Sequence, residues 1–206
     1  MDFDFPEEAT IRKNNKIIDE VLRKRIQIII SQFALKEDFK NDCSIITCSY
    51  KLKPSRRKIK KIKGSGSGVI DALFNAAMTE LTKKFHSLKE IELHDFLVKV
   101  KFNESLQQRK TDAPVEIKIA LISSNRRRMY FKSTSSSLVK AGINATCKAI
   151  EYLINAELAA MQLSKDIKHA GERNRTDLVT KYTLQLAELV KCVSYAETIK
   201  NISKKE

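Results

Sequence analysis

Three glycines alternate with serine at residues 64–68, between a basic segment and an apolar helical pattern. Gly64, Gly66 and Gly68 are three of only five glycines in the chain. A glycine turn before a helix can hold a carboxylate or a phosphate, because N–H groups there are unpaired and no Cβ blocks the approach. The spacing fits neither a P-loop, which needs a Lys after its last glycine, nor the GxGxxG dinucleotide fingerprint. We therefore expect a tight strand-to-helix turn, with Gly66 or Gly68 at positive φ, that serves packing, a ligand contact, or both.

A second chemical feature is positive charge. The chain carries a net charge of +14, and eight cations without an acid lie between residues 51 and 63. Such a run attracts polyanions with strong salt dependence, but it lacks the interleaved aromatics that stack on single strands. A solvated hairpin face is the alternative reading. The candidate polyanion-binding residues are Lys51, Lys53, Arg56, Arg57, Lys58, Lys60, Lys61 and Lys63, with Arg126, Arg127 and Arg128 as a second cluster.

Cysteine and histidine do not form a recognisable metal or catalytic motif. The four cysteines show no CxxC spacing, and the three histidines stand apart in the sequence. We therefore expect no metal, no cofactor and no nucleophile, and we expect the thiols to be free in a reducing compartment. The N-terminus lacks a basic secretory n-region, and no apolar run is long enough to span a membrane. These observations favour a cytoplasmic protein.

Hydrophobic periodicity predicts the elements that position these residues. Alternation indicates strands and helical spacing indicates helices, and the period changes after Gly68 and again after Ser137. The predicted class is α+β: two antiparallel β-hairpin or sheet-plus-helix units in a pseudo-repeat, with additional N-terminal and C-terminal helices. We predict an N-terminal helical extension at 1–42, an α+β domain at 43–164 and a C-terminal helix at 165–206. The predicted helices are 12–39, 69–85, 137–164 and 176–200, and the predicted strands are 44–52, 56–63, 91–102, 115–122 and 129–133.

Two segments carry a family resemblance. Residues 66–72, GSGVIDA, resemble the G-x-G-P-V-D-A stretch of the carboxy-terminal regulatory domain of alpha-isopropylmalate and citramalate synthases. Residues 138–153, LVKAGINATCKAIEYL, are similar to that domain's second helix, including its closing Ala-Ile-Glu-Tyr. The resemblance covers residues 43–157. Val69, Gly142 and Ile143 replace the family's Pro, Ser and Trp, and the basic strand is unusual for the family.

The resemblance implies a function without catalysis. Domains of this kind dimerise and bind an end-product amino acid between subunits, so it implies a homodimer and a small amino-acid or carboxylic-acid ligand. The implied ligand-binding residues are Gly66, Ser67, Gly68, Val69, Asp71, Ala72, Ala141, Gly142 and Ala145.

We expect a stand-alone regulatory domain and no enzyme, since the family's catalytic barrel needs about 250 residues and its paired metal histidines are absent. The apolar stripe of residues 176–200 adds to the expectation of a dimer. A nucleic-acid-binding module and an assembly scaffold are the alternatives.

Overall fold

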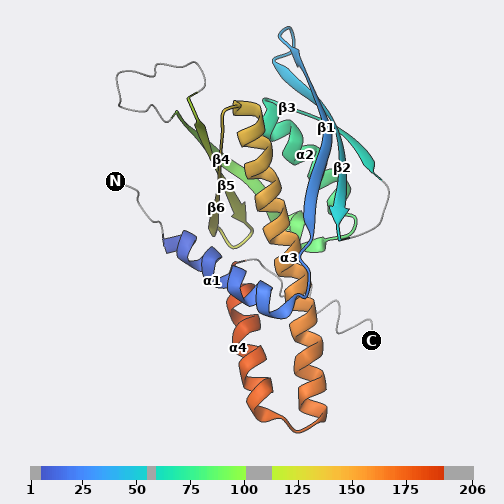
Figure 1. Cartoon of the computed structure of the whole chain (residues 1–206), viewed down its shortest axis with the longest axis vertical. Helices are drawn as coiled ribbons and strands as arrows, with labels where there is room; N and C mark the ends of the chain where they lie inside the picture. The colour runs from blue at the N-terminus through green and yellow to red at the C-terminus, as the bar shows by residue number, and fades with distance from the viewer. Residues whose placement is uncertain (1–5, 55–58, 101–112, 193–206) are drawn as a thin grey trace.

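Two three-stranded antiparallel sheets, each followed by a helix, make up the centre of the molecule. The computed structural model describes residues 6–54, 59–100 and 113–192 (Figure 1). The predicted α+β class, with two antiparallel units each closed by a helix, is confirmed. In chain order the elements are α1 Pro6–Val21, β1 Gln27–Asp38, β2 Cys43–Lys53, β3 Lys60–Gly66, α2 Val69–Leu81, the 3-10 helix η1 His86–Glu90, β4 Ile91–Val100, β5 Val115–Ser123, β6 Arg128–Ser135, α3 Leu138–Glu172 and α4 Thr176–Cys192.

The first sheet has the order β1-β2-β3 and contains a strand that the sequence pattern did not reveal. The predicted helix at 12–39 is wrong beyond Val21, because residues 27–38 form β1. A bulge lies between Ile30, which pairs with Tyr50, and Gln32, which pairs with Ser49. The extra residue reverses the alternation, so the core-facing side changes from Ile28 and Ile30 to Phe33. This change of phase produced the helix-like spacing.

The second sheet has the order β4-β5-β6, so β4 is an edge strand. Residues Phe96, Val98 and Val100 pair with Ile119, Ile117 and Val115, and therefore share their face of the sheet. Ile117 and Ile119 are buried, whereas the three β4 side chains are 52%, 41% and 40% exposed. The described helices thus cover β5 and β6 but leave this side of β4 open.

The helices α2 and α3 lie between the two sheets (Figure 1). One side of α2, with Ala72, Leu73 and Ala76, packs on the first sheet. Its other side, which includes Ile70 and Phe74, belongs to the larger core with α3 and the second sheet. Apolar residues thus occupy the two sides of α2 that face the sheets, and its polar residues are left for a narrow remaining side. The helix ends at Leu81, earlier than the predicted residue 85, and η1 follows.

Helix α3 is longer than predicted and joins both ends of the chain to the core. It has 35 residues, about 50 Å, and it continues past the predicted end at residue 164 to Glu172. Its second half packs against α4, and α1 lies across it (Figure 1). Ile18 of α1 and Leu189 of α4 belong to the same core cluster as the second sheet. One core therefore contains residues from all three segments that the sequence set apart.

The predicted helix at 176–200 begins as expected, at Thr176. The described part of its apolar stripe is covered within the chain, because Leu189 is buried and Tyr182, Leu186 and Val190 pack against the core. This stripe therefore gives no support to a dimer. The predicted residues 193–200 of this helix lie outside the described residues, as do the last two residues of the predicted strand 91–102.

Candidate functional site

Two of the three glycines are required by close packing between β3 and α2. A Cβ on Gly64 would lie 2.6 Å from the carbonyl oxygen of Ala72 and 2.6 Å from the Cβ of Ala76. A Cβ on Gly66 would meet the carboxylate of Asp71 and would lie 2.6 Å from the amide nitrogen of Ala72. All three distances are shorter than a side-chain Cβ tolerates. Gly64 and Gly66 therefore belong to the end of the strand and let it approach the helix.

Gly68 is different, because nothing around it requires a glycine. It is the N-cap of α2, with φ −165° and ψ 173°, and a Cβ there would meet no atom within 4 Å. Among the described residues no glycine has a positive φ, so the prediction of a left-handed Gly66 or Gly68 is wrong. The turn is made with extended backbone that any residue adopts. The space beside Gly68 is open to a ligand or a partner.

Asp71 organises the turn from within. Its carboxylate accepts hydrogen bonds from the amide of Ser67 at 3.0 Å and from the side-chain amide of Asn75 at 3.3 Å. The same Asn75 amide donates to the carbonyl of Ser65 at 3.2 Å. One of the N–H groups expected to be free for a ligand carboxylate is thus already used by the chain itself. Asp71 therefore caps the start of α2, and its negative charge interacts favourably with the positive end of the helix dipole.

The predicted site residues of the second helix lie in the core rather than on a cavity wall. Ala141 and Ala145 are fully buried, and a Cβ on Gly142 would lie 3.1 Å from Ile70. These small residues let α3 approach α2 and β5. The structure therefore gives them a packing role close to the start of α2, where Ile70 follows Val69.

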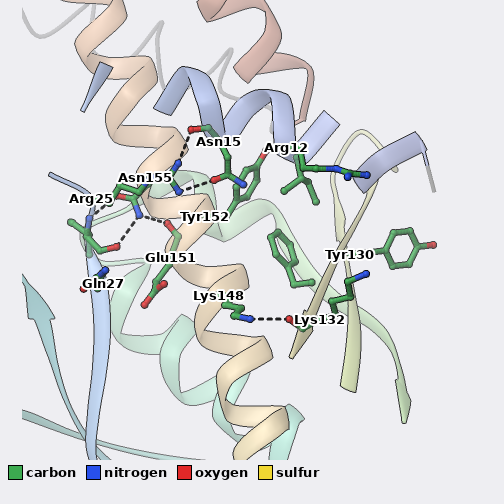
Figure 2. Close-up of a pocket in the computed structure, with 13 residues that line it drawn as sticks. Arg12, Asn15, Arg25, Gln27, Tyr130, Lys132, Lys148, Glu151, Tyr152 and Asn155 are labelled. Carbon is green, nitrogen blue, oxygen red and sulfur yellow. Dashed lines mark hydrogen bonds between the residues drawn. The ribbon is translucent and has the colours of Figure 1, made fainter. Parts of the chain in front are cut away.

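The structure also reveals a polar joint that the sequence analysis did not assign. The side chain of Asn155 in α3 accepts a hydrogen bond from the Ile26 amide at 2.7 Å and donates one to the Ile26 carbonyl at 2.9 Å (Figure 2). Glu151, one turn earlier, accepts the amide of Ile28 at 2.6 Å. Burial raises the pKa of Glu151, while the Ile28 amide and Lys148 oppose that rise. Arg25 donates to Asp19 and to the side chain and carbonyl of Asn15.

A cavity of about 530 Å³ lies beside this joint, between α1, the start of β1, α3 and β6 (Figure 2). Most of its polar groups on the β1 side are engaged in the joint. On the β6 side the wall carries Lys132, Lys148 and Tyr130, and the Lys148 ammonium donates to the carbonyl of Lys132 at 3.2 Å. The lining residues are Ile11, Arg12, Asn15, Arg25, Ile26, Gln27, Tyr130, Phe131, Lys132, Lys148, Glu151, Tyr152 and Asn155.

The two basic clusters belong to different sheets. Lys51, Lys53, Lys60, Lys61 and Lys63 lie in β2 and β3, whereas Arg126 and Arg127 lie in the turn before β6 and Arg128 is its first residue. Figure 1 shows α3 between the two sheets, so the clusters do not share one sheet surface. Arg56, Arg57 and Lys58 lie outside the described residues.

The buried thiols and the buried carboxylate of Glu157 have structural roles. Burial raises the pKa of Cys147 to about 12 and also raises that of Cys48, so these thiols stay protonated at neutral pH. The buried Glu157 accepts the amides of His86 and Ser87 and the Ser87 hydroxyl. Within the described part of the chain, no group of three His, Cys, Asp or Glu side chains is arranged to hold a metal. No described helix is long and apolar enough to cross a membrane.

Comparison with known families assigns this chain to a family. Residues 15–154 match the family described as the LeuA allosteric (dimerisation) domain, and the chain belongs to that family. The match starts well before the resemblance predicted from residue 43, because it includes the second half of α1, from residue 15, and all of β1, the unrecognised strand of the first sheet. It ends within α3, just before Asn155. No curated protein matches the chain.

Proposed function

We propose that this chain is a dimeric regulatory domain that senses a small amino acid or carboxylic acid and has no catalytic role of its own. The family match supports this most directly, because it spans both sheets, the glycine turn and most of the described core. We further propose that it acts in the cytoplasm, where its thiols stay reduced. A nucleic-acid-binding function has no specific observation in its favour.

The open side of β4 supports a second copy of the chain as partner. Phe96, Val98 and Val100 extend the buried face of the sheet beyond the helices of their own chain. A contiguous apolar face at a sheet edge exposes surface that association would bury. The family is described by dimerisation. We therefore place the dimer contact on this face.

The glycine turn supports the ligand site. Gly68 is the one glycine of the turn that packing does not explain, and it precedes the first turn of α2, where helix amides favour an anion. Val69, which is partly buried, supplies apolar surface next to it, whereas the predicted site residue Ala72 is fully buried against the first sheet. In this proposal Gly66, Ser67 and Asp71 shape the turn, and the small residues of α3 hold the two helices close together.

The test is a ligand-induced thermal shift. Leucine, isoleucine, valine and the corresponding 2-oxo acids are titrated into the wild-type protein and into Gly68→Val. Because a Cβ at Gly68 meets no neighbour, the variant should fold, and any loss of the shift then reports on the ligand. Gly171→Val is the matched control, since Gly171 also has open space around it but lies at the far end of α3.

We expect one of these compounds to raise the melting temperature of the wild type and of Gly171→Val, and to leave Gly68→Val unchanged. At a ligand concentration of about 100 times Kd, binding stabilises by about 2.7 kcal/mol, which is easily measured. If no compound shifts the wild type, the sensing function is wrong. A dimer without ligand binding would then indicate the scaffold alternative.

A further inference from the structure

Part of the basic segment lines a cavity that the regulatory function does not use. This cavity measures about 380 Å³ and lies at the end of β2, the start of β3 and the end of α2. It is therefore at the opposite end of α2 from the glycine turn. Its size falls within the range of small-molecule sites. The lining residues are Lys24, Ile26, Tyr50, Lys51, Leu52, Lys53, Pro54, Lys60, Glu80, Leu81 and Lys84.

The charge of this cavity is strongly unbalanced. Five lysines from four segments of the chain line it, and Glu80 is the one acid among the lining residues. Glu80 is already paired, because one carboxylate oxygen accepts a hydrogen bond from Lys60 and the other accepts one from Lys83 at 3.0 Å. Hydrogen bonds from these two lysines lower the pKa of Glu80. Lys51 and Lys53 alternate with the core-facing Tyr50 and Leu52, so their side chains leave the other face of β2. Lys24 and Lys84 then remain to attract an anion, and the Lys84 ammonium lies 5.0 Å from the centre of the Phe85 ring.

The base of the cavity is apolar. Ile26, Leu52 and Leu81 contribute aliphatic surface, and Tyr50 is only 4% exposed. Burial raises the pKa of Tyr50 to about 12, with a further rise from the charge of Glu80, so its phenol is neutral. An apolar base beneath a lysine rim matches a ligand that has one charged end and one apolar or aromatic part.

We propose that this cavity binds a phosphorylated small molecule of about mononucleotide size, with its phosphates on the lysine rim and its apolar part on the base formed by Ile26, Leu52 and Leu81. A single carboxylate would neutralise one ammonium group, whereas a di- or triphosphate can contact those of Lys24 and Lys84 together. Lysine binds phosphate as a point charge without the fixed geometry that arginine imposes on carboxylates. The volume leaves room for a base or a similar group beside the phosphates.

The basic segment also contains lysines outside the cavity, and these distinguish binding in the cavity from a general attraction of polyanions to the surface. Lys61 and Lys63 lie in β3 among the same basic residues, but they do not line the cavity. Ile62, between them, packs on the core of the first sheet, so the two lysines point away from α2. Binding along the outer surface would depend on Lys61 and Lys63 as much as on any other pair.

The experiment measures the fluorescence anisotropy of N-methylanthraniloyl-ADP with the full chain at about 50 mM and about 150 mM salt. Two double variants remove the same charge: Lys24→Gln/Lys84→Gln at the cavity and Lys61→Gln/Lys63→Gln as control. We expect the cavity variant to weaken binding about tenfold or more, because two charged contacts to the phosphates are lost. The control should stay within about twofold of the wild type at both salt concentrations. Unlabelled ADP should displace the probe, pyrophosphate should displace it less well, and adenosine should fail.

Three results would overturn the site. The first is a wild-type protein that does not bind the probe. The second is an equal loss in both double variants, which would show nonspecific attraction of anions. The third is displacement by an oligonucleotide at lower concentration than by ADP, which would favour nucleic acid on the outer surface. Circular dichroism verifies that both variants keep the native secondary structure. The outcome is independent of the leucine-type ligand screen, because the two sites lie at opposite ends of α2.

Discussion

The glycines of the 64–68 segment show how one residue type serves two purposes within five positions. The sequence analysis expected a positive φ at Gly66 or Gly68, yet none of the described glycines has a positive φ. Gly64 and Gly66 are needed because α2 lies against the strand, and Gly68 is needed by nothing in its own chain. Spacing alone could not separate these cases, since the difference depends on which atoms of α2 lie opposite each glycine.

Replacement of Gly64 by Ala is expected to destabilise the fold. Ala is favoured over Gly in a strand by about 0.5–1 kcal/mol, but the new Cβ would lie 2.6 Å from the backbone of Ala72. Displacing a helix backbone outweighs that gain, and overpacking of this kind costs about 1–3 kcal/mol. Urea unfolding should therefore give a lower midpoint for Gly64→Ala. Gly68→Ala, with open space around the Cβ, should match or exceed the wild type; equal loss in both variants would contradict the steric explanation.

At the scale of elements, regular alternation was predictable and interrupted alternation was not. The strands β2 and β5 and the starts of α2, α3 and α4 follow their patterns closely. β1 was missed because its bulge at Ser31 moves the apolar residues from even to odd positions. The joint formed by Glu151 and Asn155 was also missed, because its partners are backbone groups more than 120 residues away. No local pattern records such a contact.

Asn155 is expected to anchor the start of β1 to α3. Asn155→Ala removes both hydrogen bonds to Ile26 and leaves the amide and the carbonyl of that partly buried residue without them. Unsatisfied groups of this kind cost about 1–3 kcal/mol each, so a total loss of about 2–4 kcal/mol is expected. Hydrogen exchange should show that amides of β1 lose protection before those of β5. Gln162→Ala, which removes an exposed contact to Asp166 in the same helix, should change little; uniform loss of protection in Asn155→Ala would argue against a local anchor.

At the scale of the whole molecule, two sheets share one layer of helices that does not cover them equally. The helices bury β5 and β6, while the same face of β4 stays open. The apolar stripe of α4, which had suggested a partner, packs against the chain's own core over its described residues. We therefore expect the dimer contact on the edge strand β4 and not on the C-terminal helix. This relocation required the tertiary structure, because the β4 sequence alternates just as a fully covered strand does.

A charge on that face should separate the two copies. In Phe96→Glu a carboxylate replaces a side chain that is 52% exposed in the single chain, so the change should be tolerated by the fold. In a dimer that buries this face, the carboxylate would lose its water, and the dissociation constant should rise by about 100-fold or more. Sedimentation velocity across micromolar concentrations should show a dimer for the wild type and a monomer for the variant. Leu184→Glu, on an exposed position of α4, should remain dimeric. A wild-type monomer would refute the dimer, and a dimeric Phe96→Glu would place its contact on another surface, because an apolar edge that pairs with its copy cannot accept an unpaired charge at its centre.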